Sequence, residues 1–199
     1  MPRAITNRKT WLLRVGRMLG KICLPVFFRI ESRGRSHLPT GSAFVLLSKH
    51  QRWEDIPLLG LATPRPLYYV AKYELFVNPM VGWLLSSLGG VPLNRSRPLE
   101  SRRSLKRMLD LLQDGAGIVV FPEGTYYVGK MGPGLPGLVR MVLTRMTPPF
   151  VPVGIKYSRQ RIRTRVQITF GAPVRKQSAT PVAEFLDRMM AEIARLSGL

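Results

Sequence analysis

Gly117-Ile118-Val119-Val120-Phe121-Pro122-Glu123-Gly124-Thr125 is the stretch that decides the fold of this chain. Its first five residues form a short apolar run, which predicts a strand buried on both faces. Pro122 then removes a backbone donor and turns the chain out of the sheet. Strands that are buried on both faces belong to parallel sheets covered by helices, so this run indicates an α/β fold.

Short apolar runs and helical patterns alternate along the rest of the chain. Further strands are expected at residues 43–47, 67–71 and 150–155, and from Ile162 to Phe170, where apolar residues alternate with arginines to give a half-buried strand. Helices are expected at residues 56–61, 78–88 and 98–112, and after Thr180-Pro181. We therefore expect a single domain with a central, mostly parallel sheet flanked by helices.

The N-terminal segment predicts an amphipathic helix over residues 11 to 23. At 100° per residue one arc of this helix is apolar and contains Trp11, Leu12, Val15, Met18, Leu19 and Ile22. A second arc is basic and contains Arg14, Arg17 and Lys21. Such a helix either packs on the core or lies in a membrane interface, and the dense basic face favours the interface. We expect residues 1–33 to form a basic, amphipathic, membrane-associating segment and residues 34–199 to form the domain.

Composition limits the classes of partner. The chain has 199 residues with 31 Lys and Arg against 11 Asp and Glu, a net charge of +20 that attracts nucleic acid or an anionic membrane. No apolar stretch is long enough for an ordinary spanning helix, and Pro25 interrupts the run that a signal peptide would need. A single cysteine and two histidines predict neither an intrachain disulfide nor a usual zinc site.

A histidine and a carboxylate stand five positions apart after the strand expected at residues 43–47. Asp55 begins a predicted helix, and it can accept a hydrogen bond from one ring nitrogen of His50, which leaves the other nitrogen as a base for a hydroxyl. Taken alone, the same spacing also fits a helix cap beside an unrelated loop histidine. The only other histidine, His37, has no carboxylate downstream until Glu54, so His50 is the better candidate for a base.

The turn after residues 117–121 can form the opposite wall of the same site. Glu123 is expected at the carboxyl edge of the sheet, where its oxygens can bond hydroxyl groups, and Gly124 allows a substrate or another backbone to approach closely.

With these residues the chain resembles the glycerolipid acyltransferases, the family of 1-acylglycerol-3-phosphate acyltransferases. Four blocks match in order, and they are the His-x4-Asp pair, Gly90 to Arg95, Phe121 to Thr125 and Val151 to Gly154. The Phe-Pro-Glu-Gly-Thr block matches letter for letter and is the most specific. The second and fourth blocks are weak on their own.

The resemblance implies roles for individual residues. His50, held by Asp55, would take the proton of an acceptor hydroxyl, whose oxygen would attack an acyl thioester without a covalent enzyme intermediate. Arg95 would bind the acceptor phosphate, unless it is one more solvated arginine. The other substrate-binding residues implied are Glu123, Gly124 and Thr125 around the glycerol part, Lys130 in a loop over the site, and Pro152 on the acyl side, although Pro152 also fits a plain strand-edge proline.

The chain departs from the family pattern just after the third block. Tyr126 and Tyr127 stand where an arginine commonly follows Glu-Gly-Thr, and the stretch from Lys130 to Gly137 replaces a Phe-Lys-x-Gly segment. One expected phosphate partner is therefore missing, which opens the possibility of a neutral or zwitterionic lysolipid as acceptor.

The resemblance thus implies an O-acyltransferase that uses acyl-CoA or acyl carrier protein and converts a lysophospholipid, most simply 1-acylglycerol-3-phosphate to phosphatidic acid. An acceptor with another headgroup is the first alternative, and a catalytically silent lipid binder of the same fold is the second. A basic nucleic-acid-binding protein is a third, but it predicts aromatic side chains among the arginines at 159–165, and none is there. We expect no cofactor, no metal and no nucleic acid, and a peripheral or monotopic protein on the cytoplasmic side of an anionic membrane.

Overall fold

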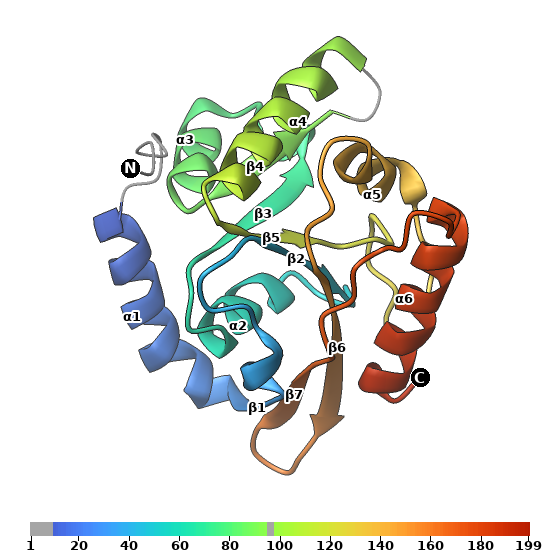
Figure 1. The fold of residues 1–199 in the computed structure, drawn as a ribbon. Coiled ribbons are helices and arrows are strands. Elements are labelled where there is room, and N and C mark those ends of the chain that lie inside the picture. The colour runs from blue at the N-terminus through green and yellow to red at the C-terminus, as the bar shows by residue number, and fades with distance from the viewer. Residues whose placement is uncertain (1–9, 95–97) are drawn as a thin grey trace.

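Seven strands form one sheet in the order β1-β7-β6-β2-β5-β3-β4 (Figure 1). The computed structural model describes residues 10–94 and 98–199. The strands are β1 (Phe28–Arg33), β2 (Phe44–Ser48), β3 (Leu67–Lys72), β4 (Gly90–Leu93), β5 (Gly117–Val120), β6 (Phe150–Arg159) and β7 (Thr164–Phe170). All neighbouring strands pair in parallel except β6 and β7, which form an antiparallel hairpin. The expected single α/β domain with a mostly parallel sheet is confirmed.

Helices cover both faces of the sheet. They are α1 (Thr10–Phe27), α2 (Asp55–Ala62), α3 (Pro79–Ser87), α4 (Pro98–Gln113), α5 (Pro136–Leu143) and α6 (Val182–Ser197), with short 3-10 turns η1 (Arg35–His37) and η2 (Tyr73–Phe76). Helices α4, α5 and α6 lie over one face, and α1 and α2 lie over the other (Figure 1).

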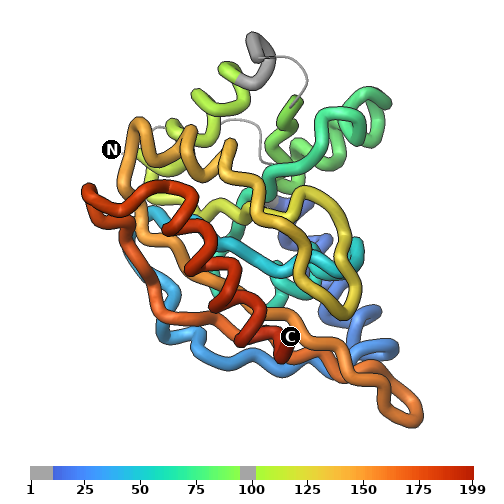
Figure 2. Tube along the Cα trace, turned by 90° about the vertical axis from the view of Figure 1, so that its right-hand side faces the viewer, coloured from blue at the N-terminus to red at the C-terminus, as the bar shows by residue number. Residues whose placement is uncertain are grey.

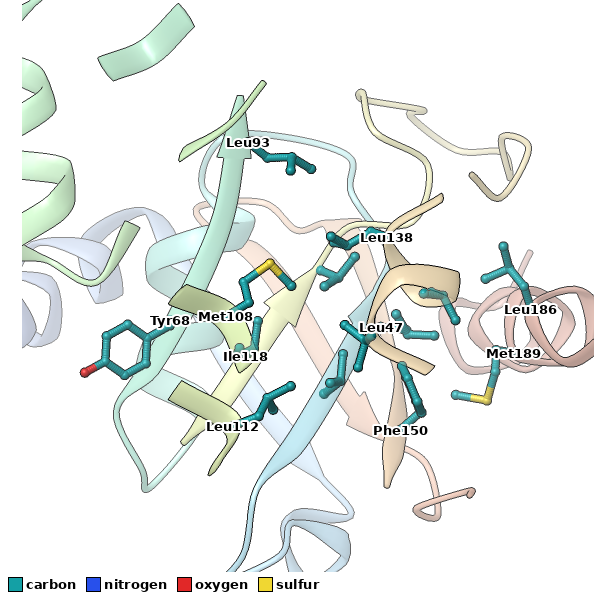
Figure 3. Close-up of a cluster of buried hydrophobic side chains, with 14 of the residues drawn as sticks. Leu47, Tyr68, Leu93, Met108, Leu112, Ile118, Leu138, Phe150, Leu186 and Met189 are labelled. Atoms are coloured by element: carbon teal, nitrogen blue, oxygen red, sulfur yellow. The ribbon is translucent and has the colours of Figure 1, made fainter. Parts of the chain in front are cut away.

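The core has two halves because side chains alternate along each strand. Val45 and Leu47 of β2 join the half beneath α4, α5 and α6, whereas Phe44 and Leu46 join the half beneath α2. Figure 3 shows the first half, in which Met108 of α4 and Met189 of α6 contribute to the cluster around Leu47. All five residues of β2 are buried, as expected for a central strand of a covered parallel sheet.

The N-terminal helix is longer than expected, and it ends directly in a strand. Pro25 lies inside α1 near its end, and β1 then begins at Phe28 and pairs with β7. Residues 28–33 are therefore part of the sheet. The boundary expected after residue 33 would place this strand in the N-terminal segment rather than in the domain. In the described part of the chain, no helix has both the length and the apolar character needed to cross a membrane.

One prediction about the last strand is wrong. Ile162 was expected to be part of a half-buried strand, but β7 begins only at Thr164, and Ile162 is 89% exposed in the turn between β6 and β7. The alternation of arginines with apolar residues continues from the strand into the turn, so the pattern does not mark where the strand begins.

Candidate active site

The site lies where parallel strands end. β2 and β5 are neighbours and run in the same direction, so their carboxyl ends meet at one edge of the sheet. His50 follows the end of β2 by two residues, and the turn from Phe121 to Gly124 follows β5 directly. Crevices at the carboxyl ends of parallel strands are the usual ligand sites of open α/β sheets.

His50 and Asp55 are in hydrogen-bonding contact. Nδ1 of His50 lies 3.1 Å from Oδ2 of Asp55, which is the first residue of α2 and is fully buried. The same oxygen accepts hydrogen bonds from the backbone N–H groups of Gln51 at 2.6 Å and Arg52 at 2.8 Å. Because Oδ2 acts as the acceptor for these two backbone donors, Nδ1 of His50 is assigned as its third donor, and Nε2 is the ring nitrogen that can act as a base.

A tyrosine from a distant strand completes the environment of Asp55. The hydroxyl of Tyr157, in β6, donates to Oδ1 of Asp55 at 2.5 Å. Burial, followed by the negative charge of Asp55, raises the pKa of Tyr157 well above its usual value, so this hydroxyl stays protonated and remains a donor. The sequence did not point to Tyr157, because no short-range pattern connects it to a carboxylate 102 positions away.

A buried ion pair joins the two loops of the site. Nζ of Lys49 donates to both carboxylate oxygens of Glu123 at 2.8 and 2.7 Å, and both side chains are completely buried. Lys49 also donates to the carbonyl oxygen of Tyr127 at 2.7 Å. Glu123 accepts further from the backbone N–H of His50 at 3.1 Å and of Gly132 at 2.7 Å.

Both carboxylate oxygens of Glu123 thus accept their hydrogen bonds from other residues of the protein. Sequence reasoning expected its oxygens to bond hydroxyl groups of a substrate, whereas here both oxygens accept hydrogen bonds from the chain. Lys49 was missed, although one signal was available. Lys49 follows the apolar run at residues 43–47 with only Ser48 between them, so it is expected near the buried end of a strand, and a buried ammonium requires a carboxylate.

Two aromatic rings hold the imidazole. The ring of His50 stacks on Phe121 with a centroid distance of 3.7 Å and an interplanar angle of 16°, and it lies 4.4 Å from the ring of Tyr126. Tyr126 stands where the family pattern has an arginine. Its ring therefore contributes packing beside the base rather than a positive charge.

A cavity of about 280 Å³ adjoins the base. His50, Gly124 and Thr125 line it together, so three of the predicted site residues share one space. Its other walls include apolar residues and one cation, namely Ile56, Val70, Leu75, Leu93 and Lys72. A cavity with an apolar lining and a few polar groups near a candidate base is typical of a small-molecule site. Lys72 was not predicted, and among the described residues it is the lysine of this lining.

The remaining predicted site residues lie elsewhere. Lys130 is exposed and does not line the cavity. Pro152 is buried in β6, where it lines a different cavity together with Phe185 and Met189 of α6. Arg95 lies outside the described residues. Within residues 10–94 and 98–199, no three histidine, cysteine, aspartate or glutamate side chains gather closely enough to hold a metal ion.

Comparison with known proteins adds an independent observation. Residues 29–156 match the family model described as Acyltransferase. The chain is 31% identical over 141 residues to the chloroplastic 1-acyl-sn-glycerol-3-phosphate acyltransferase BAT2 of Brassica napus, an alignment that covers 70% of this chain and 40% of that protein. It is 27% identical over 144 residues to a lyso-ornithine lipid O-acyltransferase of Pseudomonas aeruginosa, covering 72% of this chain and 54% of the relative.

A solved structure shares the fold. The crystal structure of the 1-acyl-sn-glycerophosphate acyltransferase PlsC from Thermotoga maritima superposes with a TM-score of 0.74 at 24% identity, covering 95% of this chain and 79% of that chain. The chain spans only about a third to a half of the length of the first curated relatives that it matches.

Proposed function

The chain belongs to the acyltransferase family, and from this premise we propose that it transfers a fatty acyl group from an acyl thioester to the hydroxyl of a lysolipid. The observation that carries the proposal is the His50–Asp55 contact at the wall of a cavity that Gly124 and Thr125 also line. Acyl-CoA or acyl carrier protein would be the donor. Neither a cofactor nor a metal takes part in the proposed reaction.

The proposed chemistry needs one base and one cavity. Nε2 of His50 takes the proton of the acceptor hydroxyl as its oxygen attacks the thioester carbonyl carbon, which forms the new C–O bond. The tetrahedral intermediate then collapses, the C–S bond breaks, and the thiol leaves with the proton that the imidazolium returns. Asp55 keeps Nδ1–H directed at itself and stabilises the imidazolium, and Tyr157 stabilises Asp55 in turn.

Glu123 and Lys49 act as positioning residues in this proposal. Their ion pair fixes the backbone N–H of His50 and the turn that carries Gly124, so the base and the opposite wall keep their spacing. A substrate contact by Glu123 would require it to release one of these hydrogen bonds. Lys130 and Pro152 remain predicted substrate contacts, and Arg95 remains a predicted phosphate ligand.

The acceptor headgroup is the finer part of the proposal. A 1-acylglycerol-3-phosphate acceptor, giving phosphatidic acid, is supported by the names of the relatives and by Lys72, a cation in the cavity lining that a phosphate can approach. A lysolipid with another headgroup is the second candidate. It is supported by Tyr126, which replaces the expected arginine beside the base, and by the relative named for lyso-ornithine lipid.

Membrane association through the N-terminal helix also forms part of the proposal. The apolar stripe predicted from the sequence faces solvent along much of its length in α1, where Trp11, Met18 and Ile22 are each at least 58% exposed. The helix packs on α2 through a different face, on which Arg17 donates to the carbonyl oxygen of Thr63 at 2.9 Å. An apolar stripe that the domain does not cover supports an interfacial role for α1 on an anionic membrane surface, whereas residues 28–33 of the expected segment belong to the sheet.

A thiol-release assay tests the proposal. Purified protein is incubated with an acyl-CoA and, in turn, with 1-acylglycerol-3-phosphate, lyso-ornithine lipid and lysophosphatidylcholine, in a Cys23→Ser background so that the only free thiol is the product. We expect acceptor-dependent release that His50→Ala lowers by about a hundredfold or more. His37→Ala is the matched control, because Nδ1 of His37 hydrogen-bonds to the carbonyl oxygen of Phe170 and the residue lies outside the cavity lining. Release that survives in His50→Ala refutes the assignment of the base.

A further inference from the structure

The hairpin between β6 and β7 projects beyond the edge of the sheet that carries the site. β2 ends at Ser48, which pairs with Val153, and β6 continues in the same direction to Arg159. Six residues beyond Val153 extend the hairpin by about 20 Å past the carboxyl end of β2. In Figure 2 the hairpin (orange), α3 and the loop after β5 all lie toward the right-hand side of the molecule.

The tip of the hairpin combines one exposed apolar residue with several cations. The backbone N–H of Gln160 bonds to the carbonyl oxygen of Arg163 at 3.1 Å and closes the turn. Ile162 is 89% exposed at this turn, and Arg159, Arg161 and Arg163 are exposed around it. An isoleucine held out in water and surrounded by arginines matches the chemistry of a lipid interface, where the apolar side chain enters the acyl boundary and the guanidinium groups meet phosphates.

Other exposed apolar residues lie on the same edge. β3 runs parallel to β5, so η2 and α3 follow a carboxyl end at that edge, and there Leu75, Val77 and Met80 are 53%, 64% and 82% exposed. Leu75 also lines the cavity beside His50. The exposed apolar groups therefore reach the margin of the site.

We propose that the hairpin tip, residues 159–163, is a second membrane-docking element, which seats on an anionic lipid surface and, together with η2 and α3, turns the His50 cavity toward that surface. The occupant is a bilayer rather than another copy of this chain, because a second copy carries the same charge of +20. The tip contains no aromatic residue that could stack on a nucleic-acid base. The consequence for substrate supply rests on the proposed function, but docking itself is measured without any reaction.

A fluorescent probe at the tip tests the docking directly. Ile162→Cys in the Cys23→Ser background is labelled with an environment-sensitive fluorophore, and Gln113→Cys is the matched control. Gln113 is exposed at the end of α4, just before β5 begins, and so lies at the opposite edge of the sheet. Vesicles of phosphatidylcholine with phosphatidylglycerol should shift the emission of the probe at 162 to the blue, and brominated lipids should quench it, whereas the probe at 113 should not respond. A probe at 162 that stays in water while the protein binds the vesicles overturns the proposal.

Charge variants test the role of the arginines. Arg161→Gln/Arg163→Gln should weaken binding to the anionic vesicles by about tenfold or more, since each cation near such a surface contributes about a factor of five. Arg175→Gln/Lys176→Gln removes the same charge beside the amino end of β6 and should have a much smaller effect. Equal losses in both variants would show a response to net charge alone and overturn the assignment to the tip.

A comparison of two substrate forms separates this inference from the proposed function. With a lysolipid dispersed in detergent, the hairpin variant should release thiol at the unmodified rate, whereas with the same lysolipid in anionic vesicles its rate should fall in proportion to binding. An equal fall with both forms overturns docking as the cause. If neither protein releases thiol with any acceptor, the proposed function fails, and the labelled protein still reports whether the tip docks.

Discussion

Removing one partner of the buried Lys49–Glu123 pair tests the most consequential feature of the site. Both side chains are fully buried, and Glu123 accepts four hydrogen bonds between 2.7 and 3.1 Å. Glu123→Gln leaves a buried ammonium without its counter-charge, and Lys49→Met leaves a buried carboxylate without one. Breaking a buried pair from one side costs about 3–5 kcal/mol, because the remaining charge stays desolvated.

The double variant discriminates this account from simple loss of packing. Lys49→Met/Glu123→Gln removes both charges together, so its loss in the free energy of unfolding should be clearly smaller than the sum of the two single losses. Urea denaturation measures these free energies. In a thermal scan each single variant should melt about 6–20 °C lower, since 1 kcal/mol shifts Tm by about 2–4 °C at this chain length.

Two results would refute the reasoning about the ion pair. Single losses below about 1 kcal/mol would mean that water reaches the pair, and additive losses would mean that the two charges do not depend on each other. Glu184→Gln is the matched control, because Glu184 pairs with Arg188 on the exposed face of α6 and should change stability little. The single variants should also lower thiol release, since the backbone of His50 loses its anchor on Glu123.

Two further predictions concern the dyad and the packing of α6. Tyr157→Phe removes the hydrogen bond that stabilises the charged carboxylate of Asp55, so the acid limb of the pH–rate profile should move up by about 1 pH unit. The raised pKa of Tyr157 keeps its hydroxyl protonated throughout, so the alkaline limb should not change. Gly154→Ala places a methyl group 2.3 Å from the backbone of Leu196 and should cost about 1–3 kcal/mol by urea denaturation, whereas Gly137→Ala, with open space in a helix, should be neutral or slightly stabilising.

Long apolar patterns predicted the main elements of the fold, and short or interrupted patterns did not. Among the strands that were found, β2, β3, β5 and β6 are apolar runs that need no tertiary context, and β7 was found from its alternation, apart from its start. β4 was missed because Pro92 interrupts a four-residue run, which is tolerated since β4 lies at the end of the sheet order. β1 was missed because it continues directly from the helix, and α5 because it begins at Pro136 within a stretch rich in glycine and proline.

The N-terminal helix shows why periodicity alone does not assign a face. The sequence correctly gave an apolar arc, and the usual inference is that such an arc packs on the core. Instead the contacts to α2 come from the other side, where Gly20 has Leu61 as its neighbour and Arg17 reaches Thr63. Gly20, Leu24 and one hydrogen bond from Arg17 dock the helix, which leaves most of the apolar arc exposed.

The residues of the candidate site also differ in whether local sequence could predict them. His50 and Asp55 were found because a base and its acid lie within one turn of chain, where spacing has a direct geometric meaning. Lys49 and Tyr157 were missed because their partners, Glu123 in the turn after β5 and Asp55 at the start of α2, lie 74 and 102 positions away and are brought near only by the sheet order. Local sequence can therefore nominate the group that would react, but the groups that fix its orientation depend on the topology.

The direction of the strands ties the site and the proposed docking surface to one edge. β2, β3 and β5 run parallel, so their carboxyl ends lie at the same edge of the sheet. His50 follows β2, Leu75 of the cavity wall follows β3, and the Glu123 turn follows β5. β6 is parallel to them and longer, so its return through β7 must place Ile162 beyond that side rather than behind it. A hairpin that pointed the other way would need β6 to run against β2, which would also remove Tyr157 from Asp55. The hydrogen bond that supports the dyad and the projection of the tip are thus consequences of a single strand orientation.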